Sequence, residues 1–211
     1  MENIKNTFHG IDKHLLIDEV PSKYLEYCYN EKLLDQYPFS ILKDLKDVDQ
    51  SPKYHPEGSV WNHTMLVLDN AASLRFNSKD PRVFMWSALL HDIGKTTTTK
   101  IRKGRITAYN HDKAGENLAK DFLELFIDDK VFIDKVSKLV KWHMQPLFVK
   151  KNLPFKNIEN MKRETSVKEV ALLSLCDRLG RGEMSEEKIK EEKNTIESFK
   201  SHCQLINCKE K

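Results

Sequence analysis

A histidine and an aspartate stand side by side at the end of an apolar segment, WSALLHDIGK, at positions His91 and Asp92. Burying a carboxylate among apolar residues costs free energy unless a positive charge compensates it. A divalent cation supplies that charge, and imidazole together with carboxylate suits Zn, Mn, Fe or Ni. The pair alone is a short motif that occurs by chance, so a metal site here needs further ligands from elsewhere in the chain.

Three other residues could supply those ligands, and each also has a plainer interpretation. His63, in WNHTMLVLDNAA, and His143, at the end of LVKWHM, lie in apolar helical patterns, where a histidine is often a hydrogen-bonded core or capping residue. Asp177 interrupts the apolar run VALLSLCDRLGR and therefore requires a cationic partner. That partner is either a metal or Arg181, which follows one helical turn later.

Lys95 follows the His-Asp pair and shares a helical face with His91 if the helix continues. A lysine beside a metal can hold a phosphate oxygen and offset the negative charge that develops in a transition state. The alternative is an ordinary solvated lysine at a helix C-terminus, where the helix dipole favours it. Gly94 permits close packing next to this position.

The elements that must position these residues are predicted to be helices, because helical periodicity recurs along the chain and strand signals are scarce. Residues 100–110 are expected to form a basic loop or a short hairpin around Gly104. The C-terminal tail is expected to fray from Ser201. The helical patterns cover residues 21–28, 39–45, 61–77, 81–93, 112–127, 131–143, 166–179 and 185–203.

The 211 residues include 35 basic and 32 acidic side chains, a formal net charge of +3. This near balance argues against a protein that holds nucleic acid by a strong positive field. The N-terminal segment lacks the apolar core of a signal peptide, and no apolar run approaches the roughly 20 residues of a membrane span. We therefore expect a cytoplasmic protein with free thiols, since no CxxC spacing is found among Cys28, Cys176, Cys203 and Cys208.

The histidines and aspartates described above follow the order H…HD…D and so resemble the signature of the HD superfamily. Its members are helical and mostly metal-dependent phosphohydrolases. Two more histidines lie between the HD pair and the last aspartate, as in the variant of the family that holds two metals. The implied ligands are His63, His91, Asp92 and Asp177 for one ion, and His111, His143 and the shared Asp92 for the other.

Longer segments are similar to the HD domain of bacterial tRNA nucleotidyltransferases, the CCA-adding enzymes, over residues 20–182. The similar segments are PSKYLEYCYNEKLLDQYPF, QSPKYHPEGSVWNHTMLVLD, SALLHDIGK, AYNHDKAGENLAKDFL and LLSLCDRLGR. Around His111 the sequence departs from that family, with Asn110 and Asp112 in place of Gly and Glu. The sequence also has no Gly-Ser turn followed by a paired-carboxylate strand, so we expect a freestanding HD hydrolase that does not add nucleotides.

The resemblance implies an all-α fold, an HD-domain helical bundle with helical extensions at both ends. The expected divisions are an N-terminal helical extension at 1–48 that packs on the HD domain, the HD domain at 49–182, and a charged C-terminal helix and tail at 183–211. The charge-rich segment 183–197 is typical of a solvated surface helix, and a surface for a partner is the alternative.

The implied activity is hydrolysis of a phosphomonoester or phosphodiester of a nucleotide or related small molecule, including 2′,3′-cyclic phosphodiesters. Two divalent ions (Mn, Fe, Ni, Zn or Mg) would activate a water and polarise the phosphoryl oxygens. Asp92 and Lys95 would be the catalytic residues. The candidate substrate contacts are His55, Arg102, Lys103, Arg105, Arg178 and Arg181. For the arginines in this set, the alternative is an ion pair within the protein or a solvated side chain.

Two other functions are compatible with the sequence. A few HD-fold proteins with the same ligand pattern hold two irons and oxygenate organic substrates, although Lys95 and the basic residues at 100–105 favour phosphate. The third interpretation is a non-catalytic module that binds a nucleotide or an RNA 3′ end. The complete ligand set and the near-neutral net charge both argue against it.

Overall fold

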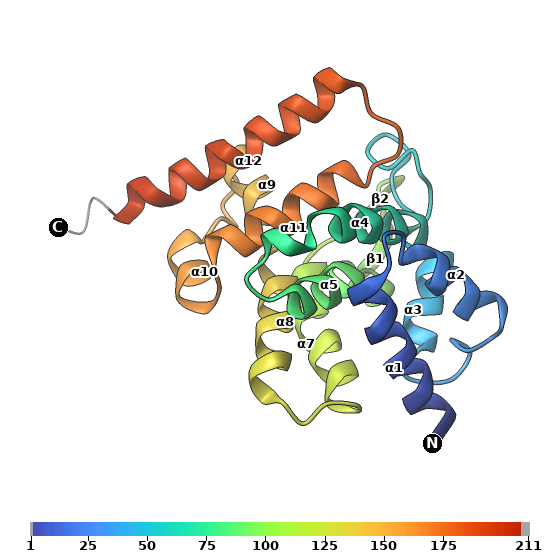
Figure 1. The fold of residues 1–211 in the computed structure, drawn as a ribbon. Helices are drawn as coiled ribbons and strands as arrows, with labels where there is room; N and C mark the ends of the chain where they lie inside the picture. Colours follow the sequence, from blue (N-terminus) through green and yellow to red (C-terminus); the bar gives the residue numbers. More distant parts are fainter. Residues whose placement is uncertain (1, 208–211) are drawn as a thin grey trace.

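The computed structural model describes residues 2–207 and shows a helical protein with one small sheet (Figure 1). The all-α fold predicted from the sequence is confirmed. The α-helices are α1 (Glu2–Ile17), α2 (Ser22–Asn30), α3 (Ser40–Asp44), α4 (Val60–Leu74), α5 (Pro81–Leu90), α6 (Lys95–Thr98), α7 (His111–Glu124), α8 (Lys130–Trp142), α9 (Gln145–Lys150), α10 (Ile158–Glu164), α11 (Val167–Leu179) and α12 (Glu186–Asn207). The remaining elements are the 3-10 helices η1 (Leu45–Asp47) and η2 (Arg75–Asn77) and the strands β1 (Thr99–Arg102) and β2 (Arg105–Ala108).

Short polar side chains determine where the two central helices begin. Ser59 accepts a hydrogen bond from the backbone N–H of Asn62 at the start of α4, and Asp80 accepts one from Val83 at the start of α5. Each cap satisfies an N–H group that has no partner within its helix. Pro81 occupies the first turn of α5, where its missing N–H costs nothing.

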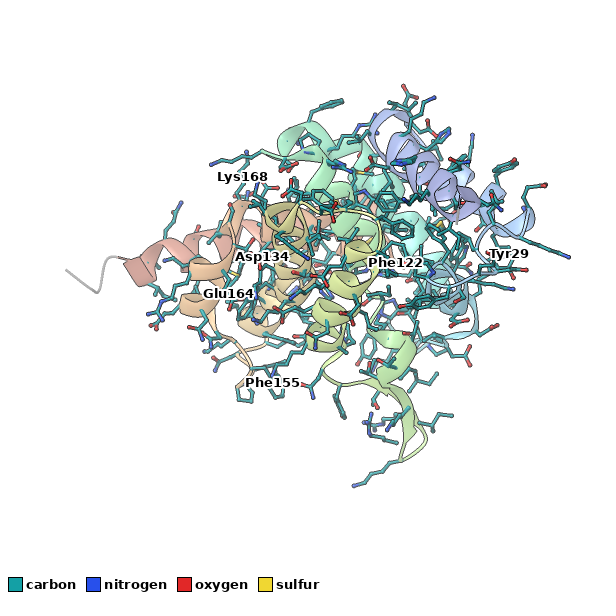
Figure 2. All side chains as sticks on the ribbon, turned by 90° about the horizontal axis from the view of Figure 1, so that it is seen from below. Tyr29, Phe122, Asp134, Phe155, Glu164 and Lys168 are labelled. Carbon is teal, nitrogen blue, oxygen red and sulfur yellow. The ribbon has the colours of Figure 1, made fainter. Side chains whose placement is uncertain are left out.

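The helices α4, α5 and α11 pack against one another at the centre, and the hairpin of α7 and α8 packs on α5. The apolar faces of these helices form a core that includes the fully buried Trp61, Phe84, Trp86 and Phe122. Figure 2 shows Phe122 among the interior side chains, whereas Phe155 lies at the outer edge of the molecule. This core holds the ends of several helices close to one another.

The N-terminal helices pack on this centre through aromatic side chains. Phe8 of α1 stacks on Trp86 of α5, with 4.8 Å between the ring centroids, and on Phe126, with 4.4 Å. The indole N–H of Trp86 donates a hydrogen bond of 2.7 Å to Asp12 of α1. These contacts cover the outer face of α5 and help to fix its position.

The C-terminal helix α12 lies along α11, on the side of the central helices opposite to α1 and α2 (Figure 1). One face of α12 is buried through Ile196, Phe199 and Cys203. Within the segment 183–197, which was predicted to be a solvated surface helix, Glu192 and Ile196 are buried, so the prediction is wrong for these two residues. The prediction of a frayed tail from Ser201 is also wrong for residues 201–207, because the helix continues to Asn207, and the rest of that tail lies outside the described residues. The apolar residues are spaced at helical intervals within the charged sequence, and they dock α12 on the domain.

A buried ion pair ties α12 to α11. Arg178, next to Asp177 in sequence, is 3% exposed and donates from Nη1 to the carboxylate of Glu192. Its Nε and Nη2 atoms have no hydrogen-bond partner among the described residues. Arg178 points at α12 and does not line the cavity described below. The prediction that it contacts the substrate is therefore wrong, and the alternative, an ion pair within the protein, is what the structure shows.

The basic segment at 100–110 forms a short antiparallel hairpin, the second of the two predicted alternatives. The strands pair from Thr99 with Ala108 to Arg102 with Arg105. Lys103 and Gly104 in the turn both have positive φ, 49° and 70°, as a two-residue type I′ turn requires. Arg102 and Arg105 are therefore held at the far end of the hairpin.

The helices α9 and α10 were not indicated by the sequence, because each is too short to show a helical period. Cys28, Cys176 and Cys203 are free thiols, as predicted, and the structure shows that all three are buried. Cys208 lies outside the described residues. No helix within residues 2–207 is long and apolar enough to cross a bilayer.

We expect the substitution Glu192→Ala to lower the free energy of unfolding by about 3–5 kcal/mol, because it leaves the buried Arg178 without a counter-charge. Urea unfolding of the metal-free protein measures this. The matched control is Glu191→Ala, which removes an exposed neighbour on the same helix. Equal unfolding midpoints for the two variants would show that the buried pair does not stabilise the contact between α11 and α12.

Candidate metal centre

The ends of five helices bring the predicted ligands together around one point. His63 lies in the first turn of α4, His111 begins α7, and Asp177 lies in the last turn of α11. The remaining ligands immediately follow the ends of α5 and α8. All six are buried: His63 and His91 are 0% exposed, His143 1%, Asp92 2%, Asp177 7% and His111 8%.

Three of the histidine rings are oriented by the backbone in the same way. In each, Nδ1 donates a hydrogen bond to the carbonyl oxygen three residues earlier. A carbonyl can only accept, so Nδ1 carries the proton and Nε2 presents a lone pair to the centre. The bonds run from His91 to Ala88 at 2.8 Å, from His111 to Ala108 at 2.8 Å and from His143 to Val140 at 2.6 Å.

Glu57 orients the fourth ring. Nδ1 of His63 lies 2.8 Å from Oε1 of Glu57 and 3.1 Å from the carbonyl oxygen of Gly180. Nδ1 of His55 lies 2.8 Å from the same oxygen of Glu57. Burial acts to raise the pKa of the Glu57 carboxyl, but the hydrogen bonds from His55 and His63 lower it to about 2. An ionised Glu57 thus fixes the His63 ring from outside the centre.

Asp92 lies between two sets of donors and presents one carboxylate oxygen to each. Its Oδ2 atom is 3.3 Å from Nε2 of His91 and 3.8 Å from Nε2 of His63. Its Oδ1 atom is 3.4 Å from Nε2 of His111 and 3.9 Å from Nε2 of His143. These are two groups of donors that could each hold a metal ion and that share Asp92.

Asp177 contacts Arg181, one of the two partners that its sequence position suggested, and it also contacts His63. Its Oδ1 atom lies 3.1 Å from Nε2 of His63 and 3.7 Å from Nη2 of Arg181. Burial acts to raise the pKa of the Asp177 carboxyl, but Arg181 and His63 hold it well below the usual range. An ionised Asp177 therefore lies beside the donor group that contains His63.

The chemistry of these donors fits a divalent cation. Nε2 of His91 is buried and has no hydrogen-bond partner among the described residues. The Nε2 atoms of His111 and His143 approach each other to 3.4 Å, and in neutral rings both present lone pairs there. Burial lowers the pKa of His111 and, with the help of neighbouring histidines, lowers that of His143 to about 4, so both rings are neutral. Convergent imidazole lone pairs and ionised carboxylates match the ligands of Zn, Mn, Fe or Ni.

Lys95 is held beside the shared carboxylate and is not freely solvated. Its ammonium lies 2.7 Å from Oδ2 of Asp92 and donates to Oε1 of Gln50 at 2.6 Å. The amide of Gln50 in turn donates to the carbonyl oxygen of Ser59 at 3.3 Å, which fixes the direction of its oxygen. Sequence reasoning missed Gln50, because glutamine is no typical ligand and its partner Lys95 is distant in the chain.

Gly94 allows the end of α5 to approach the start of α7. A Cβ atom at this position would lie 2.0 Å from the carbonyl oxygen of His111 and 2.6 Å from the backbone nitrogen of Gly115. Both are backbone atoms that cannot rotate away. Only glycine therefore permits the distance at which Asp92 and His111 meet.

A cavity of about 300 Å³ opens above the shared carboxylate. Two of the candidate substrate contacts, His55 and Arg181, line it together with Lys95. The hairpin contributes Thr99 and residues 106–108, whereas Arg102 and Arg105 do not line the cavity. Arg102 lies instead over the Tyr109 ring, 4.9 Å from its centre. The prediction that these two arginines contact the substrate is corrected, because they lie at the far end of the hairpin.

A model of the HD domain family matches residues 60–182, which is more than half of the chain. The chain belongs to the HD domain family. Members of this family are generally metal-dependent phosphohydrolases, and the buried cluster of histidines and aspartates described above fits that class.

Similar proteins include three that carry the name Multifunctional CCA protein. The one from Pasteurella multocida is 36% identical over 101 residues, which are 47% of this chain and 23% of that protein. The one from Halorhodospira halophila is 34% identical over 97 residues, 46% of this chain and 22% of that protein. The one from Methylococcus capsulatus is 26% identical over 166 residues, 79% of this chain and 32% of that protein. This HD chain thus spans a third or less of the length of these curated relatives.

We expect the substitution Glu57→Ala to weaken metal binding by about 10–100-fold, because a carboxylate that orients a ligating histidine contributes that much to affinity. Competition with a fluorescent chelator measures the dissociation constant. Asp47→Ala, which removes an exposed carboxylate ahead of the same loop, is the matched control. Unchanged affinity in Glu57→Ala would mean that His63 does not ligate through Nε2 in the orientation described.

Proposed function

We propose that this protein is a metal-dependent phosphohydrolase that cleaves a phosphomonoester or phosphodiester of a nucleotide or a related small molecule. The observation that carries the proposal is the pair of donor sets that share Asp92 at the floor of a cavity. That cavity is also lined by three cationic side chains, Lys95, Lys151 and Arg181, which suit an anionic substrate. The donors thus support metal-dependent chemistry, and the cations support an anionic substrate such as a phosphate ester.

The proposed metal ligands are the six residues gathered around Asp92, and we propose two divalent ions, with Mn, Fe, Ni, Zn and Mg as the candidates. Divalent ions at such sites supply a water of lowered pKa and polarise the phosphoryl oxygens. The protein contributes the orientation of the ligands, because a hydrogen-bond acceptor holds Nδ1 of each histidine ring, and it buries all six ligand side chains. Two ions that share one carboxylate would explain why Asp92 lies between two sets of donors.

Lys95 is proposed as the residue that stabilises negative charge on the phosphoryl group. Its ammonium lines the cavity beside Asp92, and Gln50 holds it in place. A fixed positive charge that needs no reorganisation during the reaction stabilises a transition state more than a solvated one does. Arg181 also lines the cavity and could contact a second oxygen of the same phosphate.

Nucleotides are the proposed substrates because of the cavity and the relatives. The volume of about 300 Å³ lies at the lower end of the range for small-molecule sites. The similar proteins are named for CCA, so an RNA 3′ end is a further candidate substrate. The buried free cysteines favour a reducing, cytoplasmic compartment.

We expect metal-dependent hydrolysis of bis-p-nitrophenyl phosphate, p-nitrophenyl phosphate or a 2′,3′-cyclic nucleotide by protein purified without chelator. Substitution Asp92→Ala should reduce turnover to background and lower the metal content, because both donor sets lose their shared carboxylate. The control is His202→Ala, a histidine on α12 far from the site in sequence, and it should change neither turnover nor metal content.

Bound metal without phosphate release, together with oxygen consumption by the iron-loaded protein, would favour an oxygenase and contradict the proposal. Binding of nucleotide without turnover in every metal would favour a non-catalytic module.

We expect Lys95→Met to lower kcat by about 10²-fold, the typical loss when one fixed donor to a developing charge is removed. The metal content should not fall, since Lys95 is not a ligand and its charge repels a cation at Asp92. Elemental analysis and steady-state kinetics on one sample measure both quantities, with the exposed Lys100→Met as control. A parallel loss of metal and activity would show that Lys95 acts on the site's assembly and not on the phosphoryl group.

A further inference from the structure

The cavity has a buried end and an exposed end with different chemistry. Asp92 and His143 at the inner end are 2% and 1% exposed. Tyr54, which also lines the cavity, is 55% exposed, and Lys151 is exposed as well. The cavity therefore runs from the metal donors to solvent, and Tyr54 and Lys151 lie at its mouth.

Lys151 has no ion-pair partner at this mouth, although the exposed Asp49 also lines the cavity. Among the side chains that the structure describes, no carboxylate lies within ion-pair distance of its ammonium, which instead lies 5.9 Å from the centre of the Tyr54 ring. The neighbouring Lys150 differs, because its ammonium is 2.9 Å from the hydroxyl of Thr195 and 3.4 Å from the carboxylate of Glu191 on α12. A cation that lines a cavity without a protein partner is available to an anionic ligand.

Apolar side chains line the cavity together with these two groups. Met144 and Leu147, from the segment that leads into and forms α9, and Ile106 of β2 are among the lining residues. The Tyr54 ring adds an aromatic face, on which a base or a sugar can pack. The lining therefore combines metal donors at its buried end, apolar surface, and a second positive charge at its exposed end.

We propose that the outer end of the cavity is a second anion subsite, in which Lys151 beside Tyr54 binds a phosphate that is not cleaved. This rests on the proposed function, which places the scissile phosphate at Asp92. The substrate class is then a nucleotide with two separated phosphates, such as a nucleoside 3′,5′-bisphosphate. In the reaction, the water oxygen forms a bond to the inner phosphorus, the bond from that phosphorus to the sugar oxygen breaks, and the sugar oxygen takes a proton. The outer phosphate stays on the product.

The test compares adenosine 3′-monophosphate with adenosine 3′,5′-bisphosphate on the metal-loaded full chain at low ionic strength. These probes differ only in the outer phosphate. We expect KM for the bisphosphate to be about tenfold lower than for the monophosphate, as for one hydrogen-bonded charge pair, with kcat similar. Lys151→Gln should abolish this preference, and the matched control Lys150→Gln should keep it.

Equal KM values for the two compounds in the unaltered protein would overturn the subsite, as would equal loss of preference in Lys150→Gln and Lys151→Gln. If neither compound is hydrolysed, the proposed hydrolysis fails for these esters, and the subsite is tested by itself through dissociation constants from isothermal titration calorimetry. A tenfold difference in dissociation constant that disappears only in Lys151→Gln would still support the subsite. Equal dissociation constants would overturn it.

Discussion

The buried negative charge of Asp92 is the constraint on which the rest of the site depends. Burial acts to raise the pKa of this carboxyl, yet Lys95 and the surrounding histidines hold it well below its usual range. The charge therefore persists in an interior that would otherwise neutralise it. The two carboxylate oxygens face different pairs of histidines. Neutral rings that direct lone pairs at these oxygens add no positive charge, so the arrangement suits a cation on each side of Asp92.

The fold serves that arrangement by bringing helix ends together. Gly94 lets the end of α5 contact the start of α7, and Gly180 lets the end of α11 approach α4, where a Cβ atom would lie 2.5 Å from Cγ2 of Val67. The carbonyl of Gly180 in turn accepts from Nδ1 of His63. The helices outside the centre support the helices that carry the ligands. Helix α1 packs on α5 through Phe8, and α12 is bound to α11 by the ion pair next to Asp177. Displacing either would move a ligand.

The sequence predicted the helical fold, because apolar periodicity is a local property. The six ligands that the order of histidines and aspartates suggested lie close together in the structure, and their role as metal ligands stays a prediction. The sequence did not predict the contacts that depend on the path of the chain. Gln50 reaches Lys95 from 45 residues away, and Glu57 has no recognisable partner until the loop folds over His63. Arg178 was placed near the substrate by its position beside Asp177. Adjacent residues on a helix point in different directions, and Arg178 pairs with α12 instead.

The central claim is that two divalent ions share Asp92, and anomalous diffraction from crystals grown with Mn²⁺ tests it most directly. The account predicts two anomalous peaks about 3.5–4 Å apart, the spacing of two-metal hydrolytic sites. One ion should be bound by His63, His91 and Asp177, the other by His111 and His143, with Asp92 bound to both. A single peak without a contact to Asp92, or no peak in the cavity at a Mn²⁺ concentration that supports activity, would contradict the account.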